Sequence, residues 1–484
     1  MTVPSTLATR AQAHPNLSLL TFFIGWKAWL LLVAYLSPGP AYDTSTSLLL
    51  AQSQDLPNLT RSPAPTPDSF GLLEKLTRWD AIYFMRVARR GYLFEQEWAF
   101  GWGFTKLVGV LAQPLARWGL EQTAEMVAGV LLAHTSHLLS VLALYQLTLT
   151  VFPSKRPRSS SNLALVAAAL HIISPAGIFL SAPYAESPFS LLSFSSQLLY
   201  AQTVANRVNG SKPHGTTWDH TKVVLAGFLA GLATLLRSNG LLGGLPFLGD
   251  AVLTGAAFLR NPKSAGLPAL RHLAALVVGG SFIAAGIVLP QWIAYDEICR
   301  QSLTTRPWCH RWIPSIYSWN QDHYWNVGFL RYWTLSNLPL FLLASPMLVI
   351  MSLSAVWAIR DSLNHSTNRM VSNDKPEKPG ALGQTKRVSD RITPARNITS
   401  QCLWRFALAQ LVLTISAIFV YHVQIITRIS SGYAVWYWWL ASAIVSGDLS
   451  DKETAPRWPS YVVRWMVIYG TVQGGLFASF LPPA

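Results

Sequence analysis

The chain has 484 residues, of which 51% are hydrophobic and 12% are charged, about half the charged fraction of an ordinary soluble domain. This composition excludes a string of soluble domains and indicates a membrane protein. The formal net charge of +15 does not indicate nucleic-acid binding, because the Lys and Arg residues lie mostly in links between apolar segments, where they orient membrane helices.

Apolar segments long enough to cross a bilayer recur along the chain, and we expect the first, Leu17 to Leu36, to be retained as a span. The segment 223–258 is too long for one crossing and contains Asn239-Gly240, so it predicts a hairpin of two short helices. The predicted fold is all-α, polytopic and a single membrane-embedded domain over 1–484. About eleven spans are expected, at 17–36, 126–152, 162–182, 185–203, 223–258 (two), 272–294, 336–358, 402–423, 433–447 and 461–481.

The links between spans fall into two classes. The links 153–161, 204–222, 259–271 and 359–401 are basic and fall on one side, which the distribution of Lys and Arg identifies as cytoplasmic. The last of them lacks apolar periodicity and is predicted to be a disordered basic insert.

Two links are predicted to be lumenal: 37–105, the catalytic loop, and 295–335, the substrate-binding loop. They are the richest in Trp, Tyr and carboxylates, so function is expected there. Asn58 begins a glycosylation sequon in the first loop. Among the three cysteines, only Cys299 and Cys309 are expected to form a disulfide.

The first lumenal loop contains the sequence Arg78-Trp79-Asp80, followed by an amphipathic segment that ends at Gly91. We expect this segment to form a helix that lies at the membrane surface. Asp80 is interpreted either as the N-cap of this helix or as a catalytic base, and the two roles are compatible. Arg78 and Arg86 are candidates for holding a phosphate, the alternative being contact with lipid headgroups.

The second lumenal loop combines aromatic rings with amide and carboxylate side chains, the combination that binds sugars. An aromatic belt at the membrane interface is the alternative, and it is favoured for Trp333 and for the segment 433–439. The candidate sugar-binding residues are Gln321, Asp322, Tyr324, Trp325 and Asn326.

Polar residues also occur at the ends of two predicted spans, at Glu186 and at Arg237-Ser238-Asn239. Ionisable groups at membrane depth are costly, so Glu186 and Arg237 are functional candidates, with a structural ion pair as the competing explanation. His134 and His137 lie on one predicted helix without a third metal ligand, so no metal site is expected.

Taken in order, these motifs resemble the family of GPI mannosyltransferase 2. The resemblance covers most of the chain and is carried by Tyr42-Asp43-Thr44-Ser45, Arg78-Trp79-Asp80 with Gly91-Tyr92 and Ala99-Phe100, Ser174-Pro175-Ala176 with Tyr184-Ala185-Glu186-Ser187, Arg237-Ser238-Asn239-Gly240, and Gln321-Asp322 with Tyr324 to Phe329. Relatives tend to have a Pro-Gly step where this chain has Gly101-Trp102-Gly103-Phe104.

The resemblance implies a GT-C type glycosyltransferase of the endoplasmic reticulum membrane. Its members transfer mannose from dolichyl phosphate mannose to the first mannose of the GPI-anchor precursor, forming an α-1,6 bond. Besides the donor and the precursor glycolipid, the expected partners are membrane lipids and a small accessory subunit; neither a cofactor nor nucleic acid is expected.

A β-linked donor and an α-linked product require a single inverting displacement with one carboxylate base. We expect Asp80 to be the base, with Glu95 as the reserve candidate. Arg237, with Arg78 and Arg86, is expected to hold the donor phosphate. The predicted acceptor-binding residues are Trp79, Glu186, Asn239 and the set from Gln321 to Asn326 given above.

Three other functions are compatible with the pattern. A related transferase would use the same donor with another acceptor, such as a dolichol-linked oligosaccharide or a protein hydroxyl. A polytopic lipid transporter should show inverted repeats, and none is detected in the sequence. A non-catalytic subunit would only scaffold a transferase.

Overall fold

The computed structural model describes residues 12–38, 71–154, 157–210, 214–301, 306–373, 394–449 and 457–482. The predicted glycosylation site Asn58 and the motif Tyr42 to Ser45 lie outside the described residues. Within them the secondary structure is helical throughout, which confirms the all-α prediction.

The longer helices are α2 (Pro15–Leu36), α7 (Ala124–Val151), α9 (Glu186–Asn209), α10 (Thr217–Leu236), α12 (Pro262–Tyr295), α14 (Leu338–Asn373), α15 (Pro394–Phe419) and α18 (Trp458–Ala478). The shorter ones are α4 (Gly71–Leu76), α5 (Asp80–Arg90), α6 (Trp102–Leu115), α8 (Pro157–Ile172), α11 (Leu245–Arg260), α13 (Ile316–His323), α16 (Ile426–Ile429) and α17 (Ala434–Leu449). Every predicted span overlaps one of these helices. Seven helices of the described part are long and apolar enough to cross a membrane, so the protein is polytopic, but the predicted number of eleven is not confirmed.

The hairpin predicted for 223–258 is present. Helix α10 ends where Arg237 adopts an extended backbone, and a 3₁₀ segment, η5 (Ser238–Gly244), leads into α11. Gly240 lies so close to α10 that a Cβ atom would be 2.6 Å from the backbone nitrogen of Thr234. The tight return therefore requires glycine at this position.

The structure differs from two predicted boundaries. Helix α8 stops at Ile172, and the rest of the predicted span 162–182 is a buried irregular segment that contains the 3₁₀ turn η4 (Gly177–Leu180). Pro175 explains this break, because proline cannot continue the hydrogen bonding of a helix. The prediction of a disordered insert over 359–401 is wrong at both ends, since α14 continues to Asn373 and α15 begins at Pro394; residues 374–393 lie outside the described residues.

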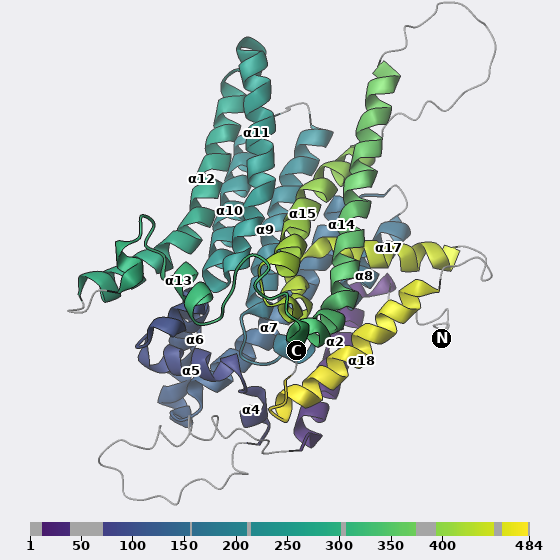
Figure 1. The fold of residues 1–484 in the computed structure, drawn as a ribbon. Coiled ribbons are helices and arrows are strands. Elements are labelled where there is room, and N and C mark those ends of the chain that lie inside the picture. Colours follow the sequence, from purple (N-terminus) through teal and green to yellow (C-terminus); the bar gives the residue numbers. More distant parts are fainter. Residues whose placement is uncertain are drawn as a thin grey trace, which may run out of the picture.

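The helices form a bundle with two different ends (Figure 1). Helices α4, α5, α6 and α13 gather toward one end, whereas the turn from α11 to α12 lies at the other. Helices α10 and α12 approach through glycines: a Cβ on Gly227 would lie 2.3 Å from the Cα of Gly279. Small residues permit this close packing of membrane helices.

A buried ion cluster joins three helices of the bundle. Asp250 of α11 accepts a hydrogen bond of 2.9 Å from Arg207 of α9 and a second one from Arg405 of α15. Both arginines come from outside α11, so the carboxylate links α9, α11 and α15 through their side chains. The cost of removing such charges from water offsets much of their mutual attraction, so the cluster is not by itself evidence of high stability.

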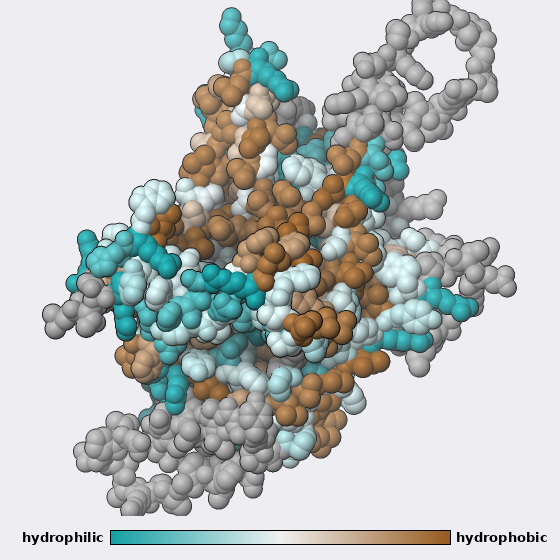
Figure 2. All heavy atoms as spheres, viewed as in Figure 1, coloured by the Kyte–Doolittle hydropathy of each residue, from teal (hydrophilic) through white to brown (hydrophobic). Residues whose placement is uncertain are grey.

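The outer surface of α11 and α12 is apolar, as the brown region of Figure 2 shows. Val252, Leu253 and Leu259 of α11 and Val277 and Val278 of α12 are exposed large hydrophobic side chains. In a polytopic protein such a surface faces lipid, because exposed apolar patches of this extent are avoided in water.

Candidate active site

A cleft with a cavity volume of about 320 Å³ lies between the two loops that were predicted to carry the function. Its walls come from the start of α5, from 98–104, from the ends of α10 and α12, from α13, and from the segment 421–429. The polar side chains in its lining are Asp80, Thr234, Arg237, Ser238, Asn239, Gln291, Tyr317, Gln321, Tyr421, His422 and Arg428, beside the rings of Trp98, Trp102 and Trp325. The cleft therefore combines one carboxylate and two guanidinium groups with aromatic and amide side chains.

Asp80 is the first residue of α5 and not its N-cap, so the capping interpretation is wrong. Trp79 occupies the cap position, and no side chain there accepts a capping hydrogen bond. Its backbone has φ 57° and ψ −132°, a conformation that L-residues rarely adopt and that stores strain. The Asp80 side chain is 42% exposed, and its Oδ2 lies 3.6 Å from Nη1 of Arg428.

Arg428 of α16 was missed by the sequence reasoning. Its guanidinium lies 4.2 Å from the ring centre of Phe179 and 5.0 Å from that of Tyr184. Burial lowers the pKa of Arg428, but the charges of Glu186 and Asp80 outweigh this and hold the pKa above its ordinary value. The sequence did contain a signal for a functional role: Arg428 is the single Lys, Arg, Asp or Glu residue between Arg405 and Asp448, and a lone charge in an apolar segment is costly.

Glu186 lies at the centre of the charges around the cleft. Its Oε1 is 2.8 Å from Nη1 of Arg237 and 3.0 Å from both Nε and Nη2 of Arg428. The residue is 1% exposed and does not line the cleft. This geometry matches the structural ion pair that was the alternative to a functional role for Glu186 and Arg237. We call Asp80, Glu186, Arg237 and Arg428 the charged quartet.

Three of the predicted acceptor-binding residues line the cleft: Asn239, Gln321 and Trp325. Asn239 accepts a hydrogen bond of 3.4 Å from Nε of Arg237 and donates one of 3.3 Å to the hydroxyl of Tyr433. It therefore links Arg237 to Tyr433, which lies outside the cleft lining.

Three others from the second loop lie outside the lining. Asp322 forms an ion pair with Arg331 in which both side chains are largely exposed. Tyr324 is 45% exposed, and its hydroxyl donates a hydrogen bond to Glu95. Asn326 has φ 51°, a turn conformation that asparagine tolerates better than most residues.

The remaining residues predicted in the first loop are also outside the lining. Arg78 is 3% exposed; it forms an ion pair of 3.6 Å with Glu74 and lies 5.0 Å from the ring centre of Phe480. Trp79 packs on the same ring. Arg86 is on α5, half-buried and away from the cleft.

Helix α5 is held by protein contacts on several sides. Ala81, Phe84 and Met85 are buried, as the amphipathic pattern predicted. Two of its arginines meet carboxylates of the same chain: Arg89 with Glu125 at 2.7 Å, and Arg90 with Glu97 at 2.6 Å. Gly91 ends the helix with φ 85°, as predicted. These contacts fix the backbone that presents Asp80.

The predicted disulfide between Cys299 and Cys309 is present in the second loop, with 5.8 Å between the Cα atoms. No group of three His, Cys, Asp or Glu side chains is arranged as a metal site in the part of the chain that the structure describes. That the reaction needs no metal or cofactor stays a prediction.

The chain matches the family model described as mannosyltransferase (PIG-V) over residues 16–484. It is 44% identical to GPI mannosyltransferase 2 of Chaetomium globosum, with 98% of each chain covered. It is 40% identical to GPI mannosyltransferase 2 of Aspergillus oryzae, over 98% of this chain and 99% of that one. An oligosaccharyltransferase of Archaeoglobus fulgidus in its apo form aligns with a TM-score of 0.43 and 12% identity, over 96% of this chain and 56% of that chain, which is too distant a likeness to support an argument.

Proposed function

Because the chain belongs to the mannosyltransferase (PIG-V) family and is therefore a membrane glycosyltransferase, we propose that it adds the second mannose during GPI-anchor assembly. In this proposal, mannose passes from dolichyl phosphate mannose to the first mannose of the precursor glycolipid and forms an α-1,6 bond. The match over nearly the full length of relatives named GPI mannosyltransferase 2 supports the acceptor class. The resemblance of the motifs supports the donor and the linkage.

One observation carries the chemical part of the proposal: a carboxylate and two guanidinium groups reach the same cleft. Asp80 supplies the carboxylate on a helix start that is fixed by buried contacts. Arg237 and Arg428 supply positive charge on the neighbouring wall, and both are anchored on Glu186. A base close to positive charge is what transfer from a sugar phosphate requires.

The reaction is a single displacement at the anomeric carbon. Asp80 accepts the proton of the acceptor 6-hydroxyl as its oxygen attacks, and the bond between the anomeric carbon and the phosphate oxygen breaks with its electrons going to phosphate. The β-linked donor thereby gives an α-linked product. A guanidinium has five N–H donors, so Arg237 can keep its bond to Glu186 while it donates to a phosphate oxygen.

The acceptor sugar is assigned to the wall formed by α13 and the turn after it, where Gln321 offers an amide group and Trp325 offers an aromatic face. Asn239, beside Arg237, offers a further amide group. Asp322, Tyr324 and Asn326 act, in this proposal, through the shape of the loop that carries Gln321 and Trp325.

We place the cleft on the lumenal side of the endoplasmic reticulum membrane. The basic links between spans and the family support this orientation. The further proposed partners are membrane lipids and a small membrane accessory subunit.

The test is transfer by the purified protein to a synthetic precursor with Asp80→Asn as the variant. Asparagine keeps the size of the side chain but cannot accept the proton, so we expect kcat to fall by roughly 10²- to 10⁴-fold, the usual contribution of a general base. The melting temperature of the variant serves as the control for folding. Normal transfer by a folded Asp80→Asn protein would refute the catalytic assignment.

The acceptor is tested separately in cells that lack the protein. Accumulation of a precursor with one mannose supports the proposed step, whereas accumulation of a truncated dolichol-linked oligosaccharide would assign the protein to another acceptor.

A further inference from the structure

Glu95 joins the two loops that form the cleft. It begins the 3₁₀ turn η2 (Glu95–Ala99) in the first loop. Its Oε1 accepts a hydrogen bond of 2.5 Å from the indole N–H of Trp308, and its Oε2 accepts one of 3.2 Å from the hydroxyl of Tyr324. Its backbone carbonyl accepts a third, of 2.6 Å, from the side-chain amide of Asn320. All three donors belong to the second loop.

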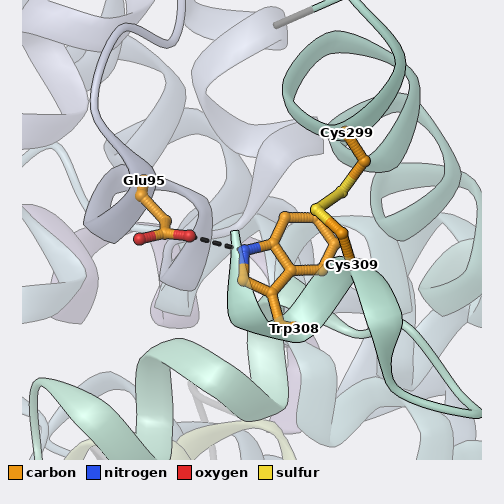
Figure 3. Close-up of a disulfide and its surroundings, with 4 residues drawn as sticks. All are labelled: Glu95, Cys299, Trp308 and Cys309. Atoms are coloured by element: carbon orange, nitrogen blue, oxygen red, sulfur yellow. Dashed lines mark hydrogen bonds between the residues drawn. A yellow bond between two sulfur atoms is a disulfide. The ribbon is translucent and has the colours of Figure 1, made fainter. Parts of the chain in front are cut away.

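The Trp308 end of this contact is fixed by a small core of its own. Trp308 is fully buried and packs with Trp98, Ala294 and Ile316 in a cluster separate from the main core. Figure 3 shows the Cys299–Cys309 disulfide beside the indole, on the side away from Glu95. The disulfide ties Cys309, the residue after Trp308, to Cys299, so the indole N–H has a defined position.

Helix α13 is the element that these bonds hold in place. At its start, Gln291 of α12 accepts hydrogen bonds from the hydroxyl of Ser315 and the backbone N–H of Tyr317. At its far end, Asn320 and Tyr324 reach Glu95. The helix therefore spans from α12 to the first loop.

We propose that Glu95 is a positioning residue that fastens α13 and the turn after it to the first loop, so that Gln321 and Trp325 face the acceptor. This inference rests on the proposed function and refines its acceptor side. It removes Glu95 from the candidates for the base, because both carboxylate oxygens already accept hydrogen bonds and the residue is not in the cleft lining. A general base must reach the hydroxyl that it deprotonates.

The two roles predict different results for Glu95→Gln and Glu95→Ala. Glutamine keeps an oxygen that accepts from the Trp308 N–H, and its NH₂ group can donate to the Tyr324 hydroxyl, which reverses that hydrogen bond but preserves the contact. We therefore expect kcat and the acceptor KM to stay within about threefold of wild type. Alanine removes both contacts, and we expect the acceptor KM to rise about tenfold with a smaller change in kcat, the size expected for a lost hydrogen bond to a charged group. If Glu95→Gln loses activity as fully as Asp80→Asn, Glu95 is a base and the proposal is wrong.

Trp308→Phe provides a second route, because it keeps a buried ring and removes only the N–H donor. We expect it to raise the acceptor KM as Glu95→Ala does, and the two changes together to be less than additive, as for residues in direct contact. Glu121→Ala, which changes an exposed carboxylate outside both loops, is the matched control and should leave KM unchanged. Fully additive effects of Glu95→Ala and Trp308→Phe would overturn the inference.

A measurement without substrate separates this inference from the proposed function. The rate at which a water-soluble phosphine reduces the Cys299–Cys309 disulfide reports how firmly the second loop is held. We expect faster reduction in Glu95→Ala than in wild type or Glu121→Ala. Faster reduction together with transfer to a different acceptor would contradict the proposed function but support the positioning role. Equal reduction rates in Glu95→Ala and wild type would contradict the positioning role alone.

Discussion

Replacing Glu186 by glutamine removes one negative charge from between two guanidinium groups. Oε1 of Glu186 lies 2.8 Å from Nη1 of Arg237 and 3.0 Å from Nη2 of Arg428, and the residue is 1% exposed. In Glu186→Gln the amide oxygen still accepts a hydrogen bond, but the remaining counter-charge for both arginines in the charged quartet is Asp80, 3.6 Å from Arg428. The two positive charges are then under-compensated in a buried site.

The size of the effect follows from that burial. Breaking a buried ion pair by removing one partner costs about 3–5 kcal/mol, because the other charge is left without compensation. Unfolding entropies of about 2.1 cal/mol/K per residue give roughly 1 kcal/mol/K for a chain of 484 residues. We therefore expect Glu186→Gln to lower the melting temperature by about 3–5 °C.

The assay is thermal unfolding of the purified protein in detergent, followed by tryptophan fluorescence. Glu121→Gln is the matched control, since Glu121 is an exposed carboxylate on the first-loop side and should change the melting temperature by less than about 1 °C. Adding Arg237→Gln to Glu186→Gln removes one of the two under-compensated charges, so the double variant should recover part of the loss. A melting temperature of Glu186→Gln equal to that of wild type would refute the charged quartet as described.

Three further predictions concern the charged quartet and the two loops beside the cleft. Arg428→Lys keeps the charge but cannot donate through Nε and Nη2 together, so we expect kcat in the transfer assay to fall about tenfold with a melting temperature close to wild type. Cys309→Ser frees the loop around Trp308 and should raise the acceptor KM in the same assay, whereas Cys402→Ser, which changes a buried free cysteine, should not. Burial raises the pKa of Glu97, but hydrogen bonds from Arg90 and from the backbone of Leu93 and Phe94 outweigh burial and lower the pKa. The ionised carboxylate therefore stabilises the fold at pH values above the unfolded pKa of about 4.3. This stabilisation is lost as the pH falls through the lowered pKa of the folded state. The melting temperature of Glu97→Gln should accordingly lie below that of wild type at pH 7, and the difference should shrink below about pH 4.

The sequence predicted the helices well because membrane helices leave a strong apolar pattern. It also predicted that Asn239-Gly240 would break the segment 223–258 and that Cys299 would pair with Cys309. It overestimated the span 162–182, because the apolar residues after Ile172 are buried as turns and not as a helix. Composition records burial but does not distinguish a buried turn from a buried helix.

The site was predicted less completely, for a reason that the residues make clear. Asp80 and Trp325 were singled out because each lies in a polar motif of a predicted loop, and Arg237 because it is a charged residue at the end of a predicted span. Arg428 follows them by more than a hundred residues and stands in an apolar context, so only the folded chain brings it to Asp80. Glu95 looked like a second candidate base because the sequence cannot show that its oxygens are already occupied.

The position of Arg428 between Asp80 and Glu186 has a consequence for the proposed turnover. Before transfer, the mobile negative charge sits on Asp80; afterwards that carboxylate holds a proton and the charge has moved to the departing phosphate. The total negative charge inside the cleft is conserved, so the arginines need only exchange one anionic neighbour for another while Glu186 keeps them in place. The lipid phosphate that leaves then carries one more negative charge than the donor that arrived. Release of the proton from Asp80 to the lumen returns the enzyme to its starting state.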